Sequence, residues 1–137
     1  MEEGIKAVEM TPHKVSSTYS PLALAYIGDS VFDLMIKTHF VQKSNMQPEK
    51  YHRVVSHIVS ANNQAAFIDE YMDELTEEEL AVYKRARNSS PHTKAKNASL
   101  ENYLKATGFE AVIGYLYLSG QNDKIRQIVE KVLETER

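Results

Sequence analysis

Apolar residues recur every three to four positions along most of the chain, which is the spacing that places them on one face of a helix. Ser20 and Pro21 form a helix start, because serine caps the first amide groups and proline fits the first turn. The apolar positions that follow predict that this helix runs to about residue 40. Residues 1–19 show no such periodicity, and we expect them to form a loose N-terminal arm.

The polar stretch over residues 41–47 predicts a loop, after which Pro48 opens a second helix. Proline is tolerated in a first turn because the amide hydrogen that it lacks has no helical partner there. The apolar residues after Pro48 keep helical spacing, and the helix is therefore expected to continue through residue 72.

Thr76 and Glu79 mark a further helix start, because they have the spacing of a capping box. In that motif each side chain accepts a hydrogen bond from the backbone amide of the other residue. This helix is expected to end near residue 87 and to be followed by a polar loop over residues 88–99. Helical spacing resumes over residues 100–118, which include the most apolar stretch of the chain.

Thr107 and Gly108 are a candidate interruption of this apolar helix, and Gly120 is predicted to end it. A final amphipathic helix covers residues 125–133. No segment alternates apolar and polar residues with a period of two, so no strand is predicted. The pattern indicates an all-α domain over residues 20–137, a bundle of about six or seven helices without an internal repeat.

The composition is consistent with this fold class and narrows the chemistry. The 137 residues suit one domain, and 42% of them are hydrophobic, enough for one core. The absence of cysteine excludes disulfides, thiolate zinc sites and cysteine nucleophiles. The chain has no run of about 18 apolar residues, and its acidic start lacks the apolar core of a signal peptide. We therefore expect a cytoplasmic protein with no membrane segment.

Charge is distributed unevenly around a formal net charge of −3. Residues 80–100 contain no Asp or Glu, although acidic residues are frequent just before them. The polar side chains of this segment suit contacts with phosphates and with 2′-hydroxyl groups, and recognition of that kind is typical of duplex RNA. The alternative is a solvated surface segment with no ligand. The candidate RNA-binding residues are Lys84, Arg85, Arg87, Asn88, Ser89, Lys94 and Lys96.

Asp29 and Glu110 are acidic residues placed within apolar helices. Asp29 follows Gly28 in "LAYIGDSVFDL", and Glu110 is the only charge in "ATGFEAVIGYLYL". A carboxylate in apolar surroundings needs compensation, and two that face each other repel. A divalent cation between them would resolve both problems, and oxygen ligands favour Mg²⁺ or Mn²⁺ over zinc.

Each of these carboxylates also has a structural interpretation. Asp29 could belong to a helix N-terminus or a small packing contact, bonding a backbone group or a lysine. Glu110 could close a capping box with Thr107. Asp33, one turn after Asp29, is interpreted as a salt-bridge residue rather than as support for a cation.

The two motifs resemble the two signatures of ribonuclease III catalytic domains. "LAYIGDSVFDL" is similar to the first, L-E-F-L-G-D-[SA]-V-L, and "ATGFEAVIGYLYLSG" to the second, F-E-A-L-I-G-A-[IV]-Y-L. The resemblance covers residues 20–135. The chain is most similar to the short Mini-ribonuclease III type, because "RARNSS" resembles a stretch of that type and the sequence leaves no room for a double-stranded-RNA-binding domain.

This resemblance implies an all-α homodimer that cleaves double-stranded RNA with Mg²⁺, leaving 5′-phosphate and 3′-hydroxyl ends. It implies that Asp29 and Glu110 are the metal ligands and catalytic residues. The implied substrate is the precursor of the large-subunit (23S) ribosomal RNA, and a ribosomal protein bound to that precursor is a candidate further partner. The alternative is a non-catalytic module that keeps this fold for binding RNA or the ribosome.

The chain departs from the family signature at two positions. Ala25 stands where the first motif has a Glu, and Thr107 stands where the second has an Asp. Half of the usual set of four carboxylates is therefore missing, which leaves the number of bound cations open.

Overall fold

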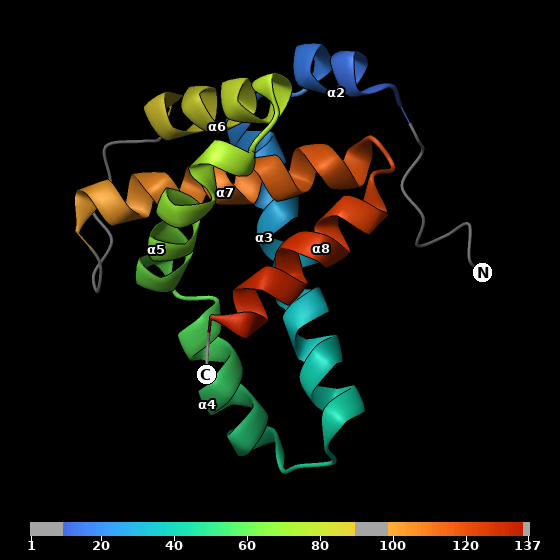
Figure 1. Cartoon of the computed structure of the whole chain (residues 1–137), viewed down its shortest axis with the longest axis vertical. Coiled ribbons are helices and arrows are strands. Elements are labelled where there is room, and N and C mark those ends of the chain that lie inside the picture. The colour runs from blue at the N-terminus through green and yellow to red at the C-terminus, as the bar shows by residue number, and fades with distance from the viewer. Residues whose placement is uncertain (1–9, 90–98, 136–137) are drawn as a thin grey trace.

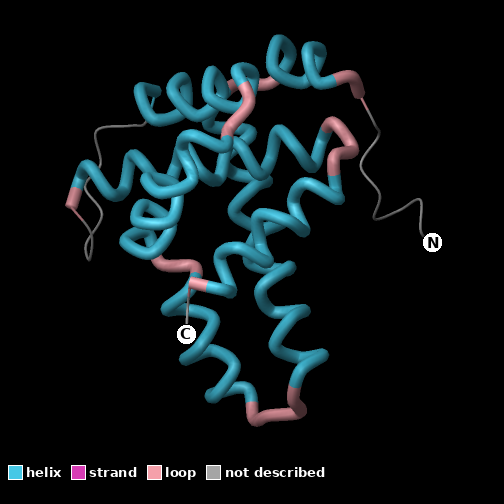
Figure 2. Tube along the Cα trace, in the orientation of Figure 1, coloured by secondary structure: helices cyan, strands magenta, loops and turns pink. Residues whose placement is uncertain are grey.

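The structure is a computed structural model that describes residues 10–89 and 99–135. The described residues form seven α-helices and one 3₁₀ turn, without a strand (Figures 1 and 2), which confirms the predicted all-α class. None of these helices is long and apolar enough to cross a membrane. The elements are α2 (Pro12–Thr18), α3 (Pro21–Lys43), α4 (Pro48–Ile58), α5 (Ala61–Tyr71), η1 (Met72–Glu74), α6 (Glu77–Ser89), α7 (Leu100–Leu118) and α8 (Asn122–Glu134).

Helix α7 is the central element of the fold. Its residues from Ala106 to Leu116 are all buried, apart from the half-buried Glu110. The helix packs mainly against α3, α5 and α6, with smaller contacts to α2 and α8. Because neighbours cover most of its circumference, α7 is apolar nearly all round rather than along one stripe.

Two helix starts follow the predicted caps. The Ser20 hydroxyl accepts a hydrogen bond from the Ala23 amide at 3.1 Å. In the capping box, the Thr76 amide donates to Glu79 Oε1 at 3.0 Å and the Glu79 amide donates to Thr76 Oγ1 at 3.1 Å. These motifs need only neighbouring residues, which is why the sequence identifies them directly.

Three predicted boundaries are wrong. Helix α3 continues to Lys43, beyond the expected end near residue 40. The helix from Pro48 stops at Ile58, because the Ser60 hydroxyl accepts a hydrogen bond from the Asn63 amide at 3.2 Å and starts α5. Helix α7 is not interrupted at Gly108.

Gly108 serves packing between helices rather than a break. A Cβ atom there would lie 2.5 Å from a ring carbon of Tyr83, closer than such atoms pack. The absence of a side chain therefore allows the Tyr83 ring of α6 to lie directly against the backbone of α7.

The N-terminal part of the chain is helical where it is described. We expected a loose arm over residues 1–19, but α2 occupies Pro12–Thr18 and its Val15 side chain is fully buried. The Arg85 guanidinium donates to the Ser16 carbonyl oxygen at 3.2 Å and ties α2 to α6. Residues 1–9 of the expected arm lie outside the described residues.

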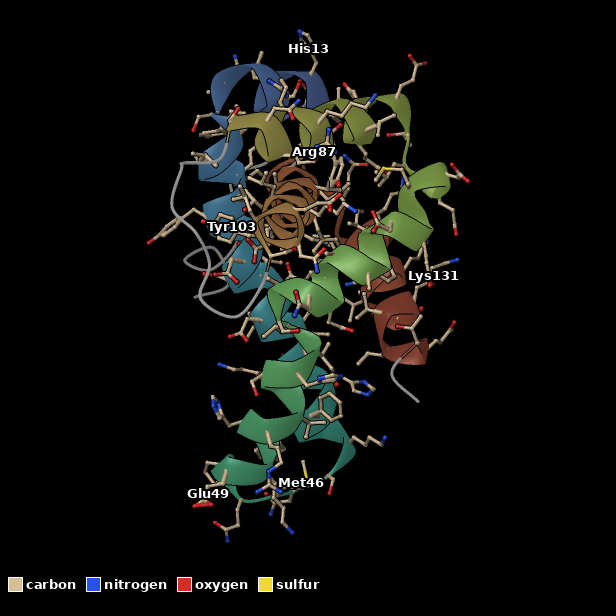
Figure 3. The ribbon with its side chains drawn as sticks, turned by 90° about the vertical axis from the view of Figure 1, so that its left-hand side faces the viewer. His13, Met46, Glu49, Arg87, Tyr103 and Lys131 are labelled. Atoms are coloured by element: carbon tan, nitrogen blue, oxygen red, sulfur yellow. The ribbon has the colours of Figure 1, made fainter. Side chains whose placement is uncertain are left out.

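Helix α4 and the C-terminal half of α3 form a hairpin that extends away from the other helices (Figures 1 and 3). The Tyr51 hydroxyl secures its turn by accepting from the Met46 amide at 2.9 Å and donating to the Ser44 carbonyl. Figure 3 shows Met46 and Glu49 at this end of the molecule and Arg87 towards the opposite end.

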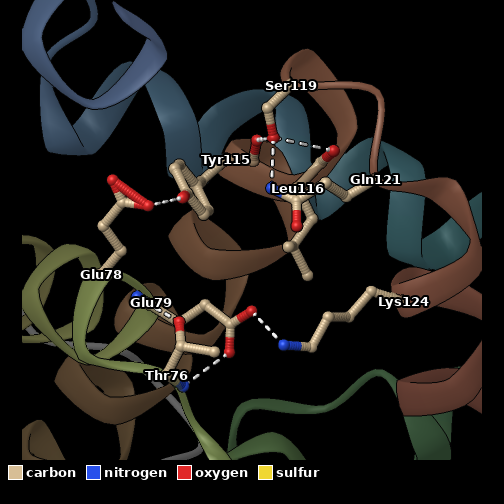
Figure 4. A network of polar contacts seen from close by, with 8 residues as sticks. All are labelled: Thr76, Glu78, Glu79, Tyr115, Leu116, Ser119, Gln121 and Lys124. Atoms are coloured by element: carbon tan, nitrogen blue, oxygen red, sulfur yellow. Dashed lines mark hydrogen bonds and ion pairs between the residues drawn. The ribbon is translucent and has the colours of Figure 1, made fainter. Parts of the chain in front are cut away.

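Glu79 connects the start of α6 to α8 through a buried ion pair (Figure 4). Only 2% of the residue is exposed, and its Oε2 lies 2.7 Å from Lys124 Nζ. The adjacent Glu78 accepts a hydrogen bond from the Tyr115 hydroxyl at 2.8 Å, which connects α6 to α7.

Candidate active site

Two glycines allow the backbones of α3 and α7 to touch. A Cβ atom on Gly28 would lie 1.7 Å from the Glu110 carbonyl oxygen, and one on Gly114 would lie 2.0 Å from the Leu24 carbonyl oxygen. Any side chain at either position would force the helices apart. The Gly-Asp pair of the first motif is thereby explained: Gly28 allows the close approach, and Asp29 is the next residue along the helix.

The close approach brings the Asp29 and Glu110 carboxyl groups within hydrogen-bonding range of each other. Burial, followed by the nearby Asp29 charge and the hydrogen bond between the two side chains, raises the pKa of Glu110 to about 8. Glu110 therefore keeps its proton at neutral pH, because a second carboxylate charge beside Asp29 would be repelled. Asp29 is exposed and Glu110 is half-buried, so the site is open to solvent.

Two of the structural interpretations of these carboxylates, the capping box for Glu110 and the helix N-terminus for Asp29, are wrong. Glu110 lies in the middle of α7, and the Thr107 hydroxyl donates to the Tyr103 carbonyl at 3.0 Å, so the two residues form no capping box. Asp29 lies within α3 rather than at its N-terminus. Asp33 pairs with Lys37 at 2.9 Å, which confirms its interpretation as a salt-bridge residue.

Gln64 of α5 is a third polar residue at this site, and the sequence reasoning missed it. Its side-chain amide hydrogen-bonds the Glu110 carboxyl, which acts to lower the pKa of Glu110. Its Oε1 atom is buried without a hydrogen-bond partner. The available signal was periodicity, because Gln64 is in phase with the buried apolar residues Ile68 and Tyr71 of the same helix.

The donor set at this site fits a hard divalent cation. Asp29 and Glu110 would hold it, and magnesium is commonly bound through one or two carboxylates together with neutral oxygens. Within the described part of the chain, no cluster of three or more His, Cys, Asp or Glu side chains could hold a metal ion. Ala25 and Thr107 account for this difference from the family signature: the first has only a buried methyl group, and the hydroxyl of the second bonds within its own helix.

The predicted basic residues that are described lie together at the C-terminal end of α6. Lys84 and Arg85 are exposed and Arg87 is half-buried, while Asn88 and Ser89 are exposed in the final turn. The causes of the shift in the Glu110 pKa include none of these basic side chains. The other two candidates, Lys94 and Lys96, lie outside the described residues.

Comparison with known proteins gives one consistent family. The Ribonuclease III domain family matches residues 22–121. The Mini-ribonuclease 3 of Clostridium tetani is 44% identical over 115 residues, which cover 83% of this chain and 76% of that protein. The Mini-ribonuclease 3 of Enterococcus faecalis is 41% identical over 120 residues, which cover 83% of this chain and 91% of that protein. A crystal structure of a Fusobacterium nucleatum protein, 30% identical, superposes with a TM-score of 0.80 over 85% of this chain and 95% of that one.

Proposed function

Because the chain belongs to the ribonuclease III family, as an endoribonuclease of its Mini-ribonuclease 3 group, we propose that Asp29 and Glu110 hold a divalent cation with which it cleaves double-stranded RNA. The observation that carries this proposal is the pair of adjacent carboxyl groups at the glycine-mediated contact of α3 and α7. Among the described residues, the side chains that act on Glu110 are Asp29 and Gln64, neither of which is basic.

The two carboxyl groups have distinct tasks in this proposal. Glu110 gives up its proton when the cation is held, and Asp29, the more exposed of the two, faces the incoming RNA backbone. Bound Mg²⁺ or Mn²⁺ supplies positive charge for the phosphate and lowers the pKa of water for attack on phosphorus. The backbone contact at Gly28 fixes the spacing of the two carboxylates, which limits their reorganisation during the reaction.

The basic end of α6 is the proposed RNA-binding surface. Lys84, Arg85 and Arg87 lie on its last turns, whereas its first turn is acidic, so positive charge is concentrated at one end of the helix. Such residues bind phosphates without reading bases, which suits a duplex recognised by its shape. Lys94 and Lys96 follow in sequence and are proposed to extend this surface.

An exposed apolar stripe on α3 supports the proposed homodimer. Tyr26 is 82% exposed and Leu34 is 64% exposed, although large apolar side chains are usually buried. A groove beside this stripe is lined by Ile27, Val31 and Leu34 of α3, together with Tyr117 and Ile125. A two-fold dimer through this face would place a carboxylate pair in each subunit, one for each strand of a duplex.

The proposed natural substrate is the precursor of the large-subunit 23S ribosomal RNA, with a ribosomal protein on that precursor as a candidate partner. The supporting observation is the group to which the chain belongs. Incubation of the protein with such a precursor should yield discrete products carrying 5′-phosphate and 3′-hydroxyl ends.

A cleavage assay tests the general proposal. Duplex RNA incubated with the protein and Mg²⁺ should be cut, and a chelator should stop the reaction. Single-stranded RNA of the same sequence is the matched control and should remain intact. RNA that is bound but never cut, with Mg²⁺ and Mn²⁺ each supplied, would instead indicate a non-catalytic RNA-binding module.

A further inference from the structure

Gln64 is the only polar residue on the buried face of α5. The other buried residues of this helix are apolar or aromatic: Ala65, Phe67, Ile68 and Tyr71. Only 2% of Gln64 is exposed, so its amide has no access to bulk water. A polar group in such a place is normally paired at both its donor and its acceptor atoms.

The amide of Gln64 is paired at one end only. Its Nε2 donates to the Val59 carbonyl oxygen at 3.0 Å, and the amide also hydrogen-bonds the Glu110 carboxyl. An NH₂ group has two hydrogens and can serve both acceptors. The reverse orientation would set Oε1 against the Val59 carbonyl oxygen, so the contact with Val59 fixes which end carries the unpaired oxygen.

Stability accounts for the paired NH₂ group but not for the unpaired oxygen. An unpaired buried oxygen destabilises a fold, and a leucine of similar size would fill the space without that penalty. Two side-chain atoms in the described part of the chain are buried and unpaired, Gln64 Oε1 and the Tyr83 hydroxyl. Of these two residues, only Gln64 hydrogen-bonds a member of the carboxylate pair.

A neutral oxygen is what this carboxylate pair lacks. A third carboxylate would add repulsion to two acids that already lie within hydrogen-bonding range of each other, whereas an amide oxygen coordinates a cation without adding charge. Ala25 has no side-chain oxygen, and the Thr107 hydroxyl is directed to the Tyr103 carbonyl of its own helix, to which it donates. We propose that Gln64 completes the cation site: its NH₂ group holds the Glu110 carboxylate, and its Oε1 is the third oxygen offered to a divalent cation.

This inference rests on the proposed function, and its test measures cation binding in the absence of RNA. Mn²⁺ is titrated into the full chain by calorimetry, and stability is measured by denaturant unfolding in a chelator. Gln64→Leu should weaken Mn²⁺ binding roughly 10-fold or more, since partners that support metal ligands usually contribute that much. The same variant loses the unpaired oxygen together with the donor to the Val59 carbonyl, two opposing effects, so its denaturant midpoint should stay close to that of the parent.

Tyr83→Phe is the matched control, because it removes the other unpaired buried oxygen. It should be as stable as the parent or more so, and should bind Mn²⁺ with unchanged affinity. Gln64→Glu reverses the pattern expected for leucine. It loses the same donor to Val59 and also adds a third acid beside Glu110, so it should be less stable than the leucine variant. It keeps an oxygen, however, and should bind Mn²⁺ at least as tightly as the parent.

Two results would overturn this inference. Equal Mn²⁺ affinity for the parent and Gln64→Leu would remove Gln64 from the site while leaving the proposed function intact. Weak binding by Gln64→Glu that matches Gln64→Leu would show that Oε1 is not a ligand. If the parent itself binds no Mn²⁺, the proposed function fails together with this inference, so the two failures are distinguishable.

Discussion

Glu79 is a buried acidic side chain and Glu110 a half-buried one, and the two have opposite kinds of partner. Both carboxylate oxygens of Glu79 have a partner. Its Oε2 lies 2.7 Å from Lys124 Nζ, and its Oε1 accepts a hydrogen bond from the Thr76 amide at 3.0 Å. Glu110 instead faces Asp29, a second acid, and together with burial this raises the pKa of Glu110 to about 8. The fold compensates the first charge and leaves the second uncompensated.

The difference shows how partners, rather than burial alone, separate a structural carboxylate from a functional one. A buried charge with a counter-ion and a backbone donor holds two helices in register. A carboxylate brought against another carboxylate lowers stability, and such an arrangement is retained where a ligand supplies the missing charge. Removing a charge at Glu110 or Asp29 should therefore affect cleavage, whereas removing the partner of Glu79 should affect stability.

The largest expected effect is the loss of cleavage when the uncompensated pair is neutralised. Asp29→Asn and Glu110→Gln each remove a charge that holds the cation while nearly preserving shape. Cleavage of duplex RNA should fall by about three orders of magnitude or more, equivalent to roughly 4 kcal/mol of barrier. Circular dichroism should confirm an intact fold, and undiminished activity in either variant would remove that residue from the site.

The compensated carboxylate should respond in stability rather than in activity. Lys124→Met leaves Glu79 buried without its counter-ion and should lower the free energy of unfolding by about 3 kcal/mol. The double variant Glu79→Gln, Lys124→Met should recover much of that loss, because no charge remains buried. Urea denaturation measures both, and a single variant as stable as the parent would contradict the structural role of the pair.

Several of these features could be predicted from the sequence, and others could not. The caps at Ser20 and at Thr76 and Glu79 need only neighbouring residues, and both are present as predicted. Gly108 was misread as a helix break, because its function is to accommodate the Tyr83 ring of another helix.

The residues of the candidate site also divide into two that the sequence identified and one that it did not. The embedding of Asp29 and Glu110 in apolar helices identified both positions, and the structure places them together. Gln64 has no comparable local signal: it lies in a polar run, "SANNQ", and its importance depends on the packing of α5 against α7. The periodicity of a single segment does not predict which distant segments will contact it.

The stability of the protein without a divalent cation should depend on pH through Glu110. Its ordinary pKa of 4.5 applies in the unfolded chain and about 8 in the folded one. Between these values the unfolded chain has lost the proton that the folded chain still holds, so the free energy of unfolding decreases as pH rises. The decrease should be about 3 kcal/mol between pH 5 and 8.

Denaturant unfolding in a chelator across this pH range measures the effect, and Glu110→Gln is the control. The difference in stability between parent and variant should change with pH in the stated direction and level off above pH 8. A constant difference would show that Glu110 titrates normally in the folded protein.

The smallest effect concerns the basic end of α6. Replacing Lys84, Arg85 and Arg87 with alanine should weaken duplex binding, and each lost phosphate contact should reduce the slope of log affinity against log salt by roughly 0.7 to 0.9. Arg85→Ala alone is the control for the contact with Ser16, since it separates loss of α2 packing from loss of RNA contacts. A triple variant that binds like the parent across a salt series would place the RNA surface elsewhere.

In the proposed cation site, Glu110 exchanges its proton for a divalent cation held with Asp29. Calorimetric titration of Mn²⁺ at pH 7, in buffers of different ionisation enthalpy, counts the protons released on binding. Because the pKa of Glu110 is raised to about 8, close to one proton should be released at pH 7 and almost none at pH 9 or in Glu110→Gln. Binding without proton release at pH 7, or with the same release in Glu110→Gln, would contradict it.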